Sequence, residues 1–320
     1  MSKYKDKKPS MIEFTRKYAN NDQACEDFFF RAKYPNGYYC EKCGCTHYKK
    51  ISTRNHVYTC SKCGHQSCLF AGTVFRDCKL NLYKLLLGLF IFFTSNKDVS
   101  AMEMRSQLDV NYKTALLLCR KCRVLMTECN SEKILDNMFY EADVAYIGSK
   151  SKEPGHQGCG TEQQPFFIAL STSRNNNYPQ FIKLRAVPKD DGETTNAFLT
   201  QSLVLSKDRT LNTDGKTTFN VMKDRITVVN EKIDYSKDNH RLYWLNTILG
   251  DIKNNIIGIY HGARKIDLPL FFGEQEYRFN HRNTGKQMMD KVAKYISKSH
   301  PMTRRQITNA LNAAFPIFAQ

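Results

Sequence analysis

The spacing of apolar residues divides the chain into a helical part and a part composed mainly of strands. Before Pro35 it predicts one or two short helices, and over residues 80–126 apolar positions again recur at helical spacing. The longest apolar run extends only from Leu85 to Phe93. A bilayer needs about 20 apolar residues, so this run predicts a buried helix and no membrane association.

Beyond residue 136 the pattern changes to short apolar runs of strand length. In chain order we expect strands over 138–148, 165–173 and 180–188, a helix over 194–204, a strand over 209–215, a short helix over 217–224, a strand over 225–233 and a helix over 242–253. Thr194 or Thr195 is expected to cap the first of these helices. The order predicts a mixed sheet with helices packed on it, which is also the order of the ribonuclease-H-like fold.

In the last of these helices, Leu242, Leu245, Leu249 and Ile252 form an apolar stripe that predicts packing against the sheet. Asn246 and Lys253 lie together on its flank. Asp251 is turned about 140° away from Asn246, toward solvent.

A helix-turn-helix pattern precedes the strands. Ser100 and Glu103 form a capping box, the first helix ends near Leu108, and a short turn over 109–111 leads into a second helix. Polar residues at the start of the second helix favour docking on DNA, whereas plain helical packing is the alternative. The residues expected to contact DNA in this helix are Lys113, Thr114, Arg120, Lys121 and Arg123.

Four cysteines have the spacing of a zinc ribbon. Cys40 and Cys43 form one C-x2-C pair, Cys60 and Cys63 form another, and a glycine follows each pair. Four thiolates close a tetrahedral site, so the expected Zn²⁺ is structural. Cys45 and His65 are nearby spare ligands and are interpreted as bystanders.

The charge adds a prediction about partners. The 320 residues include 48 Lys+Arg against 31 Asp+Glu, a formal net charge of +17. This excess favours a polyanionic partner, nucleic acid above all. The N-terminal sequence has no apolar export signal, and the 12 cysteines then fit a reducing compartment.

Several stretches together resemble bacterial DDE insertion-sequence transposases of the ISXO type and the eukaryotic Merlin transposons. These stretches are YPNGYYCEKCG, AGTVFRDCKLNLYKLLLGLF, VNYKTALLL, LNTDGKTTF and IKNNIIGIYHG followed by YRFNHR. The resemblance implies a zinc ribbon, a helix-turn-helix and a ribonuclease-H-like catalytic domain, in that order. It also implies a DNA-associated protein, cytoplasmic or, in a eukaryote, nuclear, that assembles as a homodimer or larger on double-stranded DNA.

The resemblance also implies a site. Asp143, Asp214 and Asn246 would bind Mg²⁺ or Mn²⁺, and Lys253 would contact a terminal phosphate. Asn246 stands where the family usually has Glu, and Val144 stands where an acid usually follows the first Asp. Glu141 shares a strand face with Asp143 and is an alternative ligand. Arg278 and Arg282 of the YRFNHR stretch are further expected DNA contacts.

The predicted function is therefore a transposase that cuts element ends and joins them to target DNA. A domesticated or inactive transposase that only binds DNA is the alternative, and a structure-selective nuclease is a third. The expected domains are a helical segment (1–36), the zinc ribbon (37–72), a helical region (73–135) with the helix-turn-helix at 97–126, the catalytic domain (136–285) and a basic helical tail (286–320).

Overall fold

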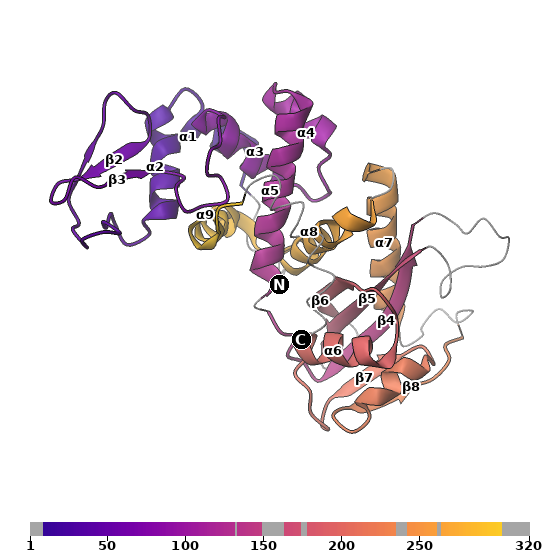
Figure 1. The fold of residues 1–320 in the computed structure, drawn as a ribbon. Coiled ribbons are helices and arrows are strands. Elements are labelled where there is room, and N and C mark those ends of the chain that lie inside the picture. The colour runs from indigo at the N-terminus through magenta and orange to yellow at the C-terminus, as the bar shows by residue number, and fades with distance from the viewer. Residues whose placement is uncertain are drawn as a thin grey trace, which may run out of the picture. The chain divides into compact units, whose positions relative to one another are not determined.

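The computed structural model describes residues 9–131, 133–148, 163–173, 178–234, 242–260 and 264–302. The chain separates into two compact units, drawn together in Figure 1. The first contains residues up to Glu128 and takes in a returning segment from Arg282. The second extends from Cys129 to His281. The lysine-rich first eight residues and most of the predicted tail, 303–320, lie outside the described part of the chain.

The first unit begins with two helices, α1 (Met11–Tyr18) and α2 (Asp22–Lys33). An antiparallel sheet follows, in the order β1 (Tyr48–Lys50), β2 (Val57–Cys60) and β3 (Gln66–Cys68). Buried Glu26 of α2 accepts hydrogen bonds from the Tyr58 hydroxyl at 2.5 Å and the Lys50 ammonium at 2.6 Å. The sheet is therefore attached to α2 by a charged contact, and the edge-to-face contact of Phe30 with Tyr58 adds an apolar one.

Three helices follow the ribbon, and their limits agree with the predicted ends of the helix-turn-helix. They are α3 (Leu82–Thr94), α4 (Ala101–Leu108) and α5 (Tyr112–Ser131). The Ser100 hydroxyl accepts the Glu103 amide at 3.1 Å, as the capping box predicts, and Asn111 caps α5 by accepting the Thr114 amide at 2.9 Å. Asp109 turns the chain between α4 and α5 in a left-handed conformation, with φ of 48°.

The returning segment contributes η3 (Gly285–Gln287) and α9 (Met288–Lys298), and α9 packs against α2 and α3. Just after α9, the Ser299 hydroxyl accepts the Val74 amide at 3.0 Å. The described part of the expected tail is thus an integral part of the first unit.

The second unit is built on a five-stranded mixed sheet with strand order β6-β5-β4-β7-β8 (Figure 1). Its strands are β4 (Phe139–Ile147), β5 (Gln164–Thr172), β6 (Pro179–Ala186), β7 (Thr210–Thr213) and β8 (Thr227–Asn230). The first three pair antiparallel, whereas β7 pairs parallel with β4 and β8 parallel with β7. This confirms the predicted mixed sheet and ribonuclease-H-like order.

Helices cover both faces of the sheet. Helix α6 (Gly192–Ser202) and η1 (Thr217–Met222) pack on the face that carries Tyr140, Ala142 and Val144. Helices α7 (Tyr243–Tyr260) and α8 (Leu268–Asn280), the latter preceded by η2 (Lys265–Asp267), cover the face that carries Ala145 and Ile147. The apolar stripe of α7 is buried there, as its spacing predicts. The predicted cap of α6 is wrong, because Asp191 accepts the Thr194 amide.

Side chains of α8 occupy the exposed edge of the sheet. Asn280 accepts the amide of Ile182 on β6 at 2.8 Å and donates to the carbonyl of the same residue at 3.0 Å. Two residues along β6, the Leu184 amide donates a hydrogen bond to the Glu276 carboxylate at 3.1 Å. An edge strand offers unpaired backbone groups to other chains, and here two side chains satisfy them.

Candidate functional site

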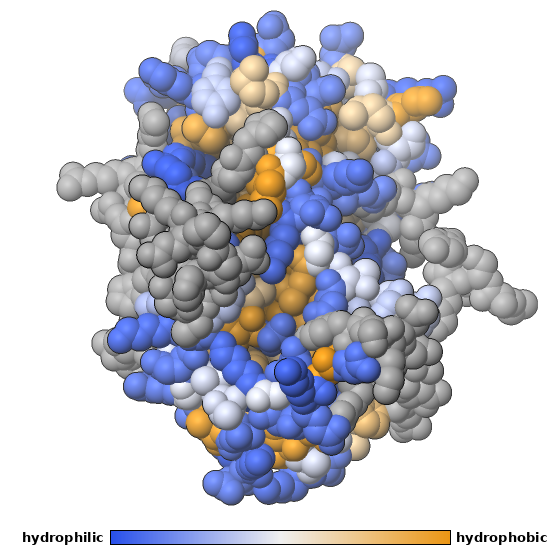
Figure 2. All heavy atoms as spheres, turned by 90° about the vertical axis from the view of Figure 1, so that its right-hand side faces the viewer, coloured by the Kyte–Doolittle hydropathy of each residue, from blue (hydrophilic) through white to orange (hydrophobic). Residues whose placement is uncertain are grey.

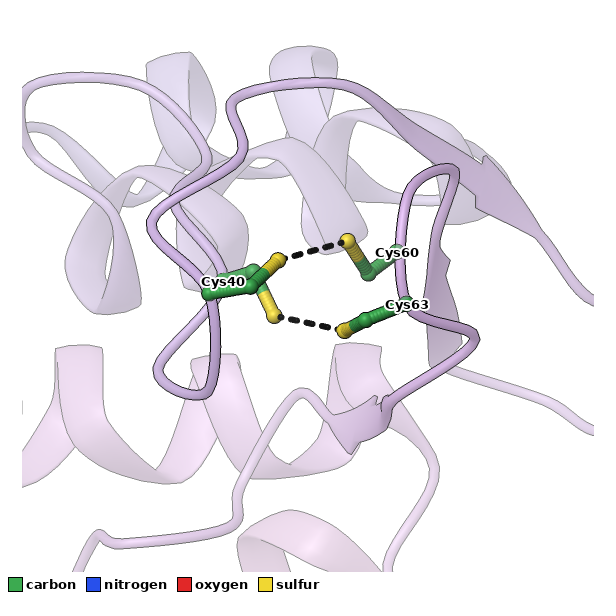
Figure 3. Close-up of side chains that lie close together, drawn as sticks. Cys40, Cys60 and Cys63 are labelled. Carbon is green, nitrogen blue, oxygen red and sulfur yellow. Dashed lines mark hydrogen bonds between the residues drawn. The ribbon is translucent and has the colours of Figure 1, made fainter.

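The four cysteines of the ribbon lie on two matching loops whose sulfurs point toward one another (Figure 3). In the first loop the Gly44 amide donates to the Cys40 carbonyl at 2.8 Å, and in the second the Gly64 amide donates to the Cys60 carbonyl at 3.1 Å. Both glycines have φ near +70°, which side chains disfavour. Local backbone geometry, set by the C-x2-C-G spacing, therefore positions each pair of thiols.

The arrangement fits a tetrahedral metal ion. The sulfurs of Cys40 and Cys63 are 3.6 Å apart, as are those of Cys43 and Cys60, and all four lie within 4.8 Å of one another. A Zn–S bond of about 2.3 Å in a tetrahedron requires sulfurs about 3.8 Å apart. Cys45 does not join the cluster, and its thiol instead points to the His47 carbonyl at 3.8 Å.

On the sheet, Asp143 and Asp214 come from neighbouring parallel strands. The β4–β7 register ends with Glu141 opposite Asn212; Asp143 lies two residues further along β4, and Asp214 immediately follows the end of β7. Parallel neighbours lie about 4.8 Å apart and point to the same side at equivalent positions. The fold therefore brings these two carboxylates together, although 70 residues separate them in sequence.

Electrostatics at Asp143 reflect this proximity. The pKa of Asp143 is raised to about 6, chiefly by burial and in addition by the nearby negative charge of Asp214. The Val144 amide, which donates to Asp143 at 2.7 Å, and the charges of Lys216 and Lys253 act in the opposite direction. Two carboxylates that repel one another in a partly buried place form a site suited to a cation.

Asp214 is held by the turn that follows β7. Its carboxylate accepts the Ile233 amide at 2.9 Å. The next residue, Gly215, has φ of 66°, and a Cβ there would lie 3.2 Å from the backbone of Lys232. The turn therefore needs glycine both for its conformation and for its close approach to the segment after β8.

Helix α7 carries the other two predicted residues. Its start is attached to β4 by buried Glu141, which is 1% exposed and accepts the Leu245 amide at 3.1 Å. Asn246 is the next residue, and its side-chain nitrogen is buried without a hydrogen-bond partner. Lys253, about two turns further along, is close enough for its charge to lower the pKa of Asp143. Glu141 shares the face of Asp143 as expected, with its carboxylate engaged by α7.

Sequence reasoning missed a second lysine beside the carboxylates. Lys216 follows Asp214 by two residues and forms an ion pair with Asp190, which also accepts the Tyr146 hydroxyl. The Lys216 ammonium lies 5.7 Å from the centre of the Tyr146 ring. The only signal in the sequence was a lysine in the TDGK stretch, and its partners lie in two other segments.

The predicted DNA contacts fall into two groups. Lys113 and Arg282 are exposed, Thr114 and Arg120 are partly exposed, and these four stay predictions. Arg123 is 4% exposed with its guanidinium 5.6 Å from the Phe92 ring, and Lys121 is 7% exposed. Arg278 is bound to Glu274 at 2.6 Å with its side chain 9% exposed. Helix packing buries these last three side chains, and their contact with DNA also stays a prediction.

The exposed surface is otherwise rich in polar groups. On the face drawn in Figure 2, hydrophilic side chains cover most of the coloured surface, with hydrophobic ones in smaller patches. None of the helices in the described ranges is long and apolar enough to span a membrane.

Two family models match the chain. A transposase zinc-ribbon domain matches residues 20–66, and an ISXO2-like transposase domain matches residues 135–280. No curated protein matches significantly. The first match includes all four clustered cysteines, and the second includes Asp143, Asp214, Asn246 and Lys253. The zinc ribbon, the mixed sheet and these two matches together identify the chain as a member of the ISXO2-like, IS1595-type family of DDE transposases.

Proposed function

We propose that this transposase binds the ends of a mobile element and catalyses metal-dependent cleavage and transfer of DNA strands. The observation that carries the proposal is the proximity of Asp143 on β4 and Asp214 just after its parallel neighbour β7, with Lys253 of α7 close to Asp143. Phosphoryl transfer needs cations at the reacting phosphate and an oriented nucleophile, and this cluster offers residues for both.

The acidic and amide side chains of the site offer the oxygen ligands that divalent cations such as Mg²⁺ prefer. Asp143, Asp214 and the amide oxygen of Asn246 would hold Mg²⁺ or Mn²⁺. Bound divalent ions would activate water and stabilise the leaving oxygen. Because an amide is neutral, Asn246 leaves the site with one negative charge fewer than a third carboxylate would, and we expect weaker metal affinity than in a site with three acids.

The lysines of the site have a separate task. Lys253 lies on α7 and Lys216 lies just after β7, and both charges reach Asp143. A DNA strand that passes the carboxylates would bring its phosphates to these ammonium groups. They would bind and orient the strand as point charges, while Asp143 and Asp214 would orient the reacting groups.

The first unit would supply binding to the element ends. Lys113 and Thr114 lie at the exposed start of α5, the second helix of the helix-turn-helix, and Arg120 lies two turns along. A helix so placed reads base edges with its first turns. Cleavage and joining of two ends requires two active sites, so we propose a homodimer or larger assembly on DNA.

The test uses DNA duplexes copied from the regions that flank the gene, with Mg²⁺ or Mn²⁺. We expect Asp143→Asn and Asp214→Asn to lose cleavage by at least about 1,000-fold while duplex binding is retained. Asp251→Asn, on the exposed side of α7, is the matched control and should cleave normally. Unchanged cleavage by either active-site variant would overturn the proposed site. Asn246→Ala should also lose activity. An active Ala variant would show that Asn246 is not part of the metal site.

A second candidate is a DNA-binding protein that no longer cleaves. It is favoured by the side chains near Asp143. Among the described residues, only the four ribbon cysteines form a cluster of at least three Cys, His, Asp or Glu side chains close enough to share a metal ion, and the carboxylates of the second unit do not. Specific duplex binding without cleavage of any flanking sequence would support this candidate. Cleavage without strand joining would instead indicate a structure-selective nuclease.

A further inference from the structure

A cavity of about 580 Å³ lies in the first unit, where the segment before α3 meets the turn that leads into α5. Its apolar wall includes Phe75, Leu80, Val110 and Leu117. Ligand cavities in proteins commonly measure about 300–1,000 Å³, so this one can hold a group of nucleotide size. It is separate from both the zinc cluster and the carboxylates of the second unit.

The same cavity is lined by a buried cation. Lys121 is 7% exposed, and its ammonium donates to the Arg76 carbonyl at 3.4 Å, close to the limit for a hydrogen bond. It also lies 5.9 Å from the Phe75 ring centre. Among the described residues no carboxylate forms an ion pair with it, although the charge of Asp77 is near enough to act on it. A buried charge without an anionic partner is costly, and an anion entering the cavity would relieve that cost.

The entrance is positive as well. Lys79 and Lys113 line the cavity and are exposed, whereas Asp77 is the acidic residue of the wall. Asp77 lies 3.7 Å from the guanidinium of its neighbour Arg76. The first turn of α5 borders the cavity at Asn111 and Thr114, which adds the positive end of the helix dipole.

We propose that this cavity binds an unpaired nucleotide of DNA, with its phosphate against Lys113 and Lys121 and its base on the apolar wall. The inference rests on the DNA binding proposed above and deepens it. An apolar surface beside a positive channel is the arrangement that holds unstacked bases, and it explains why Lys121 faces a cavity instead of the DNA groove. A bare phosphate would use the lysines and leave the apolar wall unused.

The first test is calorimetric titration of the full-length protein with dAMP and with dTMP. Both should bind, and deoxyadenosine and inorganic phosphate should each bind at least about tenfold more weakly. Failure of either nucleotide to bind at millimolar concentration would overturn the inference, and so would equal binding of inorganic phosphate.

Variants separate the parts of the site. Lys121→Met removes the buried charge, and Leu117→Trp fills the cavity without touching a lysine; each should weaken dAMP binding about tenfold or more. Lys49→Met, an exposed lysine on β1, is the control and should bind normally. Zinc content and circular dichroism confirm folding. Unchanged dAMP binding by Leu117→Trp would overturn the assignment of this cavity.

The second test asks whether the cavity binds a nucleotide that is part of a DNA strand or only a free nucleotide. A blunt duplex is compared with the same duplex carrying one unpaired nucleotide at an end. The overhang should tighten binding about tenfold in the wild type and not in Leu117→Trp. Equal affinity for the two duplexes would overturn the inference while leaving duplex binding intact. Loss of all duplex binding would instead contradict the proposed function.

Discussion

The carboxylate of Glu141 on β4 accepts the backbone amide of Leu245 on α7 at 3.1 Å. This contact attaches the start of the helix that carries Asn246 and Lys253 to the strand that carries Asp143. Such a bond satisfies one of the amides that a helix leaves unpaired at its N-terminus.

From this contact we expect Glu141→Leu to reduce DNA cleavage about tenfold or more, because α7 loses its attachment beside Asn246. Glu141→Gln keeps an acceptor oxygen and should retain most activity. The accompanying measurement is hydrogen exchange of the Leu245 amide, which should speed up in the Leu variant only. Equal exchange in both variants would contradict a positioning role.

The raised pKa of Asp143 makes a prediction about stability. Its native pKa of about 6 lies above the value of about 3.9 expected in an unfolded chain. Ionisation therefore costs native stability, and this penalty appears as pH rises from about 4 to about 6. Without divalent ions, Asp143→Asn should be more stable than wild type at pH 7, by on the order of 3 kcal/mol.

Denaturant unfolding at several pH values checks this prediction. The difference between Asp143→Asn and wild type should vanish near pH 4. It should also shrink when Mn²⁺ is added at pH 7, because the ion stabilises only the wild-type carboxylate. A difference independent of pH would contradict the assigned cause.

Lys216 makes a prediction about DNA affinity. If it binds a phosphate beside the carboxylates, Lys216→Met should lower the dependence of log affinity on log salt by about 1. Lys223→Met, exposed just after η1, is the matched control and should leave the slope unchanged. Fluorescence anisotropy at a series of salt concentrations measures both. If the slope of log affinity against log salt is unchanged in Lys216→Met, Lys216 contacts no phosphate and serves only in its ion pair with Asp190.

The zinc ribbon should depend on its four clustered thiols and on no other nearby ligand. Cys60→Ser should lose bound zinc and the fold of β1–β3, because structural zinc supplies folding free energy. Cys45→Ser should keep one zinc per chain, since its thiol lies outside the cluster. Elemental analysis of the purified variants measures both outcomes, and zinc loss from the Cys45 variant would contradict the assigned ligand set.

A buried ion pair in the second unit makes a prediction about stability. Lys183 contacts Glu276 at 3.1 Å, and both side chains are almost fully buried. Glu276→Leu should cost about 3–5 kcal/mol, because it leaves Lys183 buried without an anion. Adding Lys183→Met should recover most of that loss. Unfolding followed by fluorescence of Trp244, the single tryptophan, reports on this unit, and additive losses would contradict the coupling.

Much of the fold follows from local patterns along the chain. The cysteine spacing determines each zinc knuckle because a C-x2-C-G turn is a local structure, and apolar periodicity determines the order of helices and strands. Capping residues such as Ser100 also act within one turn. The cap of α6 was misplaced by three residues, since Asp191, Thr194 and Thr195 are all capable of capping and their sequence does not rank them.

Tertiary structure decided which charged side chains reach which partner. Asp143 and Asp214 were identified from sequence, yet only the parallel β4–β7 pairing explains their mutual effect. Lys121, Arg123 and Arg278 looked like surface contacts because a lysine or arginine in a helix is usually exposed; packing of distant segments turned them inward. The pairings of Lys216 with Asp190 and Glu141 with Leu245 likewise join residues far apart in sequence. Such contacts depend on how the segments pack, and no local pattern encodes them.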